Sequence, residues 1–294
     1  MAISLKDLKK VKATQPPRSL IYGPPGLGKT TLASEWPGAV FLQVEDGTPS
    51  DLELNSFGRL TTFDEVMEAI AALYTEEHDN STVVMDSLEK LEPLVWAKCA
   101  EANQWTSIEA PGYGKGYVLA DIYWRDFIEG MNALRRDKNM AIVYIGHSSI
   151  ETVNDPMTAS YTRYDIRLHK RAVGIFQDEV DAIFFLNQDV SLKQNDERAK
   201  SGTGARLRAD GGGNRYIYST PRPAFVAKNR YNIPDKLRFE KGKGFATLSQ
   251  YFPGGTPPAA DKPAEPAKGA KPADGKTPKA SAAADKKAPA KAAA

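Results

Sequence analysis

The chain has 294 residues, a formal net charge of +2 and a single cysteine, Cys99. One cysteine excludes an intramolecular disulfide and a cysteine-based metal cage, and the longest apolar runs, such as residues 141–145, are too short to span a bilayer. We therefore expect a soluble protein of a reducing, cytoplasmic compartment, without a membrane partner.

Residues 254–294 differ in composition from the rest of the chain. They are almost all Ala, Pro, Lys, Gly and Asp, and they hold eight lysines against four acidic residues. Because this segment has too few apolar side chains to offset its ordering entropy, we predict a disordered tail. With +4 in the tail and +2 overall, the remaining chain carries −2, so any contact with nucleic acid must be local. We expect a basic arm over 1–18 and one α/β domain over 19–253.

Apolar runs alternate with helix-forming stretches along this domain. Buried strands are predicted at 19–22, 39–44, 82–85, 141–145 and 181–187. Helices are predicted at 29–35, at 63–74 with a cap at Thr61 or Thr62, from the residues after Asp86 to about 103, and at 120–136. This alternation predicts a doubly wound, mostly parallel sheet, in which ligands gather at the carboxyl ends of the strands. A β-hairpin with a glycine-rich turn is predicted over 206–219.

The segment GPPGLGKT, residues 23–30, matches the phosphate-loop pattern GxxxxGK[ST] between a predicted strand and a predicted helix. Its glycines permit a tight loop whose N–H groups converge on the α- and β-phosphates of a nucleotide, and the helix adds its positive N-terminal end. Lys29 would reach the β- and γ-phosphates, and Thr30 would hold Mg²⁺. The predicted ATP-binding residues are Gly23, Pro24, Pro25, Gly26, Leu27, Gly28, Lys29, Thr30 and Thr31.

Two carboxylates follow neighbouring predicted strands. Asp86 comes directly after TVVM and is predicted to hold Mg²⁺ opposite Thr30, the alternative being a carboxylate that caps a loop. The extended loop sequence GPPGLGKTTLA resembles AAA+ loaders and branch-migration motors, which place a catalytic Glu directly after this Asp. Here that position is Ser87, so the carboxylate that activates water must come from elsewhere, and Glu45 is where RecA-type ATPases keep theirs.

The order of motifs between residues 19 and 252 resembles the short, core-only RecA-like ATPases of bacteriophages, a group related to RecA and RadA and associated with single-strand annealing and recombination. The elements that carry the resemblance are GPPGLGKT, FLQVEDG, VVMDS, PGYGKGY, VYIGHS, SYTRYDIRLHKRA and VAKNRYNIP. The resemblance implies a RecA-like P-loop NTPase fold with a C-terminal β-hairpin, a homo-oligomer in a ring or filament, and single-stranded DNA as partner, with a single-strand DNA-binding protein as a further partner.

The same resemblance implies roles for other residues. His147 would be a sensor of the γ-phosphate; the alternatives are a structural histidine and, less favoured because His78 and His169 are not at ligand spacing, a metal ligand. Lys228 and Arg230, in a stretch similar to the KNRFG motif of RadA, would reach a neighbouring subunit's γ-phosphate. The two DNA-binding segments would be the PGYGKGY loop and residues 148–171. The DNA contacts that these segments supply are Tyr113, Lys115, Tyr117, Arg163, Arg167, Lys170 and Arg171.

The sequence thus predicts an ATPase that assembles on single-stranded DNA and promotes phage recombination or repair. One alternative is a single-strand DNA-binding and annealing protein that uses ATP as an assembly switch with little turnover. Another is an AAA+ helicase loader, which Ser87 disfavours.

Overall fold

The computed structural model describes residues 14–189, 191–194, 207–210 and 212–255. Strands β8 (Ser191–Gln194) and β9 (Leu207–Asp210) form a separate two-stranded sheet. Ten strands form the main sheet: β1 (Arg18–Gly23), β2 (Ala39–Gln43), β3 (Asn55–Arg59), β4 (Thr82–Asp86), β5 (Ala141–Val153), β6 (Tyr161–Ile166), β7 (Ala182–Gln188), β10 (Arg215–Tyr218), β11 (Lys228–Asn229) and β12 (Lys236–Phe239). The described helices are α1 (Lys29–Ser34), α2 (Phe63–Thr75), α3 (Leu88–Ala102), α4 (Lys115–Asp137), α5 (Lys170–Glu179) and α7 (Gly244–Ser249).

The main sheet has the strand order β12-β10-β7-β1-β5-β4-β2-β3. All neighbours from β7 to β3 are parallel, whereas β10, β11 and β12 join antiparallel at the β7 side. The expected mostly parallel α/β sheet is therefore confirmed. Its parallel strands read as continuous apolar runs because helices cover both faces.

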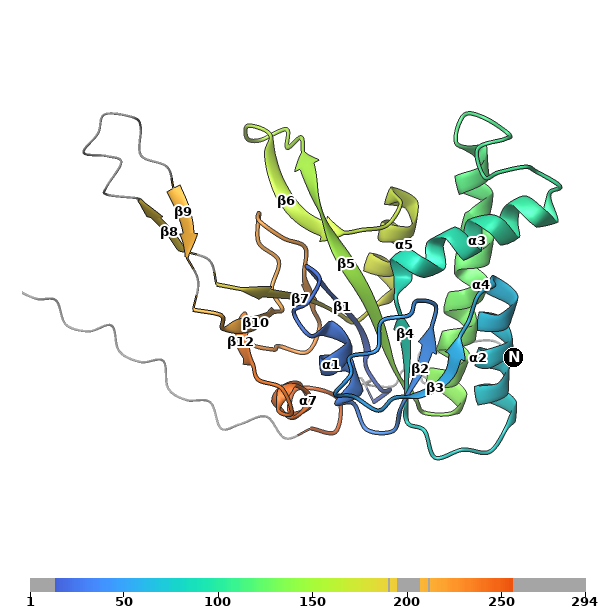
Figure 1. Cartoon of the computed structure of the whole chain (residues 1–294), viewed down its shortest axis with the longest axis horizontal. Coiled ribbons are helices and arrows are strands. Elements are labelled where there is room, and N and C mark those ends of the chain that lie inside the picture. Colours follow the sequence, from blue (N-terminus) through green and yellow to red (C-terminus); the bar gives the residue numbers. More distant parts are fainter. Residues whose placement is uncertain (1–13, 190, 195–206, 211, 256–294) are drawn as a thin grey trace, which may run out of the picture. The chain divides into compact units, whose positions relative to one another are not determined.

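Alternate residues of β1 divide between two cores, as the two-residue period of a strand requires. Leu20 and Tyr22 pack into the larger cluster with α2, α3, α4 and α5, while Ile21 packs with Leu32 of α1 and Leu248 of α7. Figure 1 shows α2, α3 and α4 together on one side of the sheet, and α1 and α7 apart from them. The first turn of α2 is fixed by a capping box between Thr62 and Glu65, which confirms the predicted cap.

Three expectations about the connections are wrong. Helix α4 begins at Lys115, so Lys115 and Tyr117 lie in its first turns rather than in a loop. Strand β5 continues past its predicted end at residue 145 to Val153 and pairs antiparallel with β6, so residues 148–166 of the second predicted DNA-binding segment form a hairpin. This β5–β6 hairpin extends beyond the sheet on the same side as the α3–α4 connection (Figure 1).

The third concerns the hairpin predicted over 206–219. Residues 207–210 pair with 191–194, whereas Arg215–Tyr218 joins the main sheet between β7 and β12. The reason is that the open backbone edge of β7 is paired by β10, and this pairing buries the side chain of Ile217 in the core. Residues 1–13 of the predicted arm and 256–294 of the predicted tail lie outside the described residues, and β1 begins at Arg18, the last residue assigned to the arm. In the described part of the chain, no helix combines the length and apolarity needed to cross a membrane.

Candidate functional site

The register of the parallel strands brings the predicted site residues to one edge of the sheet. His147 of β5 lies opposite Gly23 of β1, and Asp86, the last residue of β4, lies opposite Ile145 of β5 and Gln43 of β2. Glu45 follows two residues after Gln43. The carboxyl ends of four neighbouring strands thus supply the phosphate loop, a histidine and two carboxylates to a single region.

A cavity of about 410 Å³ lies at this edge. It is lined by the loop and its helix, by the predicted carboxylates and histidine, and by residues that the sequence did not single out. The lining residues used below are Gly28, Lys29, Thr30, Glu45, Asp51, Asp86, His147, Arg215 and Lys241.

The loop before α1 has the shape of a phosphate cradle. Gly26 and Gly28 have φ angles of 77° and 91°, in the left-handed region that favours glycine. The Lys29 ammonium is buried and donates hydrogen bonds to the carbonyl oxygens of Gly23 at 3.2 Å and Pro24 at 3.0 Å. Burial lowers the pKa of Lys29 to about 8, against the nearby carboxylates, which raise it. An anion in the cavity would therefore find a desolvated cation whose hydrogen-bond partners, in the described part of the chain, are carbonyl oxygens.

Thr30 and Asp86 are in direct contact. The Thr30 hydroxyl donates a hydrogen bond of 2.9 Å to Oδ2 of Asp86. Burial, together with the negative charges of Glu45 and Glu89, raises the pKa of Asp86 to about 6 despite this bond. A hydroxyl and a carboxylate are oxygen donors that Mg²⁺ prefers, and a buried carboxylate with a raised pKa gains from a cation beside it. These two groups therefore fit a magnesium ion.

Ser87 links the strand that ends in Asp86 to Glu45. Its hydroxyl donates a hydrogen bond of 3.2 Å to Oε1 of Glu45, which lies on the connection after β2. Glu45 is half-buried and Asp46 is exposed, so Glu45 is the carboxylate of this pair that faces the cavity. Ser87 thus connects the end of β4 to a glutamate on the connection that follows the neighbouring strand β2.

The sequence interpretation missed Glu89, in the first turn of α3. Oε1 of Glu89 lies 2.6 Å from Nδ1 of His147, and its Oε2 accepts the backbone N–H of His147 at 3.1 Å. Burial raises the pKa of Glu89, but the hydrogen bond and charge of His147 outweigh that effect and leave the pKa below its usual value. The sequence contains a signal for Glu89, because it stands three residues after Asp86 in the first part of the predicted helix. A side chain at this position lies close to the end of the strand that carries Asp86.

The second group that the sequence did not indicate comes from the C-terminal strands. Arg215 of β10 donates from Nη1 to the carbonyl oxygen of Leu27 in the loop at 3.1 Å. Lys241 lines the same cavity and pairs with Asp51. No local motif marks these residues, because their place depends on the pairing of β10 with β7 and β12.

The residues predicted to bind DNA from the PGYGKGY segment are in two environments. Tyr113 is fully exposed, and Lys115 is exposed at the start of α4. Tyr117 instead stacks on His169 with ring centroids 4.4 Å apart, and its hydroxyl donates to Glu109 at 2.9 Å. Tyr113 is therefore free to stack on a base, whereas Tyr117 already has a protein partner.

The basic residues of the second predicted DNA segment also divide. Arg163 pairs with Asp165 at 2.7 Å, and Arg171 pairs with an aspartate of α4 at 2.5 Å. Arg167 and Lys170 are exposed and form no ion pair among the residues that the structure describes. Arg167 also lies near the phosphate loop, since its N–H donates to the His147 carbonyl at 2.9 Å and its charge contributes to the lowered pKa of Lys29.

Lys228 and Arg230 lie at the opposite edge of the sheet. Strand β11 pairs with the first residues of β7, whereas the phosphate loop follows the last residue of β1. Lys228 donates to the carbonyl oxygens of Gln177 at 2.6 Å and Asp178 at 3.0 Å, at the C-terminal end of α5. Neither Lys228 nor Arg230 lines the cavity of its own subunit.

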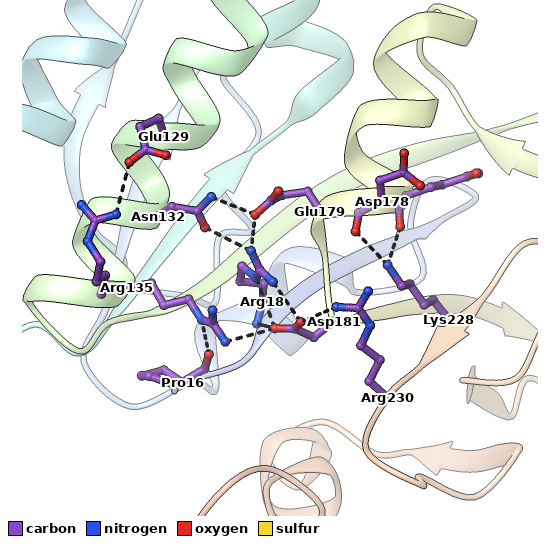
Figure 2. A network of polar contacts seen from close by, with 12 residues as sticks. Pro16, Arg18, Glu129, Asn132, Arg135, Asp178, Glu179, Asp181, Lys228 and Arg230 are labelled. Carbon is purple, nitrogen blue, oxygen red and sulfur yellow. Dashed lines mark hydrogen bonds and ion pairs between the residues drawn. The ribbon is translucent and has the colours of Figure 1, made fainter. Parts of the chain in front are cut away.

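The Arg230 guanidinium is about half exposed and pairs with the buried carboxylate of Asp181 at 3.1 Å. Figure 2 shows this carboxylate at the centre of a network, with Arg18 and Arg135 on its other sides. Burial raises the pKa of Asp181, but the hydrogen bond and charge of Arg18 outweigh burial and leave the pKa low. Arg230 is the outermost of these arginines, so its removal leaves the carboxylate paired.

A protein-family model described as AAA domain matches residues 15–231, from the segment before β1 to the residues that follow β11. Among curated proteins, none matches the chain. The matched span contains the phosphate loop and both carboxylates that follow neighbouring strands.

Proposed function

We propose, since the chain belongs to the AAA domain family, that this protein binds ATP with Mg²⁺ and hydrolyses it to ADP and phosphate. The observation that carries this proposal is the contact between Thr30 and Asp86 in the cavity that also holds Lys29 and Glu45. A phosphate cradle, a pair of magnesium donors and a separate carboxylate are the parts that phosphoryl transfer to water requires.

In this proposal each group of the chain has one role. The loop N–H groups and the Lys29 ammonium bind the phosphate chain, and the Glu45 carboxylate, oriented by Ser87, accepts a hydrogen bond from the attacking water and takes its proton. Thr30 and Asp86 would hold Mg²⁺, which supplies electrostatic stabilisation of the charge on the phosphates. His147, held by Glu89 at both its ring and its backbone, would sense the γ-phosphate.

We extend the proposal to single-stranded DNA, in line with the resemblance to RecA-like phage ATPases. Support comes from exposed groups on the side of the sheet where the cavity lies, namely Tyr113 and Lys115 near the start of α4 and Arg167 and Lys170 near the base of the β5–β6 hairpin. Aromatic stacking and phosphate contacts of this kind bind single strands without base-specific readout. Recombination or repair of phage DNA is the corresponding biological role.

Head-to-tail assembly is part of the same proposal. Lys228 and Arg230 lie at the edge of the sheet away from the cavity, so they reach a γ-phosphate only in a neighbouring subunit. A heterologous contact of this type builds rings or filaments. Arg230 would exchange its bond to Asp181 for the phosphate, and the other arginines would keep that carboxylate paired.

A second candidate is a DNA-binding and annealing protein for which ATP is an assembly switch. The intramolecular partners of Lys228 and Arg230 favour slow turnover in an isolated subunit. Rates of phosphate release with and without single-stranded DNA separate the two candidates. A rate that rises several-fold with DNA supports the ATPase. Nucleotide-dependent DNA binding with negligible turnover in both conditions supports the switch. A protein that does not bind DNA and whose turnover is the same with and without DNA contradicts the DNA part of both candidates.

A further inference from the structure

The pairing of the C-terminal strands places a cation beside the phosphate loop. Arg215 begins β10, and it lies opposite Gln188 at the carboxyl end of β7 and opposite Phe239 of β12. Since β7 is the neighbour of β1, this position is two strands away from the strand that delivers the loop. The topology therefore gives the loop a basic neighbour that is remote in the sequence.

The Arg215 side chain is fixed by two contacts that leave most of its donors available. Its Nη1 donates to the Leu27 carbonyl oxygen at 3.1 Å, and its guanidinium carbon lies 4.8 Å from the centre of the Phe239 ring. The group also packs closely on Gly28, where an added Cβ would come within 2.8 Å of Nη1. A guanidinium has five N–H donors in a planar fork, so the remaining donors match the geometry of a phosphate.

The charge of Arg215 lacks a carboxylate partner. Lys241, another cation of the cavity, pairs with Asp51, whereas Arg215 forms no ion pair with any residue that the structure describes. Its only hydrogen bond there is to the neutral carbonyl of Leu27. An arginine that is stacked on a ring and oriented along a cavity wall is organised for an anion before the anion arrives.

We propose that Arg215 binds the phosphate chain of the nucleotide within the same subunit, on the α- and β-phosphate side of the loop. This inference rests on the proposed nucleotide binding. Arg215 approaches Leu27 and Gly28 from the β7 side of β1, whereas Asp86 and His147 approach from the β5 side. In the proposed function the attacking water and the γ-phosphate lie beside the carboxylates. Arg215 therefore faces the α- and β-phosphates, which ADP and ATP share.

Binding of ADP and of a non-hydrolysable ATP analogue, each with Mg²⁺, tests the proposal by calorimetry on the full chain. Arg215→Ala and Arg215→Gln should each weaken both ligands by about 10- to 100-fold, the range expected for a hydrogen bond to a charged group. Arg215→Lys, which keeps the charge, should recover part of the affinity. Arg238→Ala is the matched control, because Arg238 lies on the adjacent strand with an exposed side chain paired to Glu240, and it should bind like the unmodified protein.

The glutamine variant helps to separate phosphate binding from support of the loop, because it keeps a neutral N–H donor on this side of the loop and removes the charge. Wild-type affinity in Arg215→Gln together with weak binding in Arg215→Ala would show that Arg215 only supports the loop, and the inference would be overturned. Wild-type affinity in both variants would overturn it as well. If the unmodified protein binds neither nucleotide, the proposed function fails and this inference fails with it. Equal binding by the unmodified protein and all the Arg215 variants is a different result, because it overturns this inference alone.

Discussion

Glu89 and Glu92, one turn apart on α3, accept hydrogen bonds from the backbone at the two ends of the β5–β6 hairpin. Oε2 of Glu89 accepts the N–H of His147 at 3.1 Å, and Oε1 of Glu92 accepts the N–H of His169 at 2.9 Å. Helix α3 begins directly after Asp86 and Ser87. The helix that follows the proposed magnesium carboxylate therefore holds both ends of the hairpin, next to the exposed cations Arg167 and Lys170.

Glu92 makes stability depend on pH in the neutral range. Burial raises its pKa to about 7, with a smaller contribution from the charge of Glu89. Between the ordinary carboxyl pKa, about 4.3, and 7 the folded state holds a proton that the unfolded state has lost, so stability falls as pH rises through this window. The contribution to stability is full below that window and lost above it.

Glu92→Gln should remove this dependence, because the amide oxygen still accepts from His169 without a charge. We expect the variant to be more stable than the unmodified protein by about 1 to 2 kcal/mol at pH 8 and nearly equal to it at pH 5. Chemical denaturation at both pH values measures the difference. An equal effect of the substitution at pH 5 and pH 8 would assign the shift in stability to another group.

Glu45 and Asp46 provide a matched test of the water-activating carboxylate. Glu45→Gln should keep ATP binding and lower kcat by about 10²- to 10⁴-fold, the usual contribution of a general base. Asp46→Asn, on an exposed neighbour, should retain near-normal kcat. Steady-state phosphate release measures both, and an inactive Asp46→Asn beside an active Glu45→Gln would reverse the assignment.

The exposed tyrosine and the basic residue at the hairpin base should affect DNA binding in different ways. Tyr113→Ala should weaken single-strand binding by about 1 to 3 kcal/mol with little change in salt dependence, because stacking is not ionic. Arg167→Ala should lower the slope of log K against log salt by about 0.7, the value for one phosphate contact. Tyr74→Ala, a partly exposed tyrosine at the end of α2, is the control. Affinity that stays unchanged in the Tyr113 and Arg167 variants would remove these residues from the DNA surface.

Local sequence was sufficient for the parts of the molecule that depend on short-range order. Strands, phosphate loop and Asp86 were predicted because buried parallel strands read as continuous apolar runs and a glycine-rich loop has a fixed spacing. Glu45 lies at the expected carboxyl end of the sheet, because the register of β2 and β4 aligns Gln43 with Asp86. The structure places these residues together, and their chemistry stays a prediction.

Long-range pairing explains what the sequence did not reveal. Arg215 belongs to the cavity because β10 covers β7, and the short segment 215–218 was instead assigned to a local hairpin. Tyr117 was assigned to a loop because three nearby glycines resemble a turn, yet Gly114 is the N-cap of α4 and Tyr117 packs on His169 from another helix. Neither contact has a signature within a short window of sequence.

Sharing of the active site between subunits is tested by mixing two inactive variants. Arg230→Ala keeps a sound phosphate loop and Lys29→Ala keeps a sound Arg230, so each should be inactive alone. In an equimolar mixture about a quarter of the head-to-tail junctions combine a sound loop with a sound arginine, and activity should reappear. Because Arg230 is half exposed and Asp181 retains Arg18 and Arg135, the melting temperature of Arg230→Ala should stay near the original. Full activity of Arg230→Ala alone, or a silent mixture that still assembles, would contradict the shared site.

Phosphate release at saturating ATP and Mg²⁺, compared between the unmodified protein and Lys29→Ala, tests the ATPase proposal most directly. Lys29 is the buried cation of the loop, and its hydrogen-bond partners among the described residues are carbonyl oxygens. We expect turnover in the unmodified protein and a loss of about 10²- to 10³-fold or more in the folded variant, as for removal of a preorganised charge-stabilising group. Equal turnover in both proteins, or none in the unmodified protein with DNA present, would contradict the assignment of this cavity as an ATPase site.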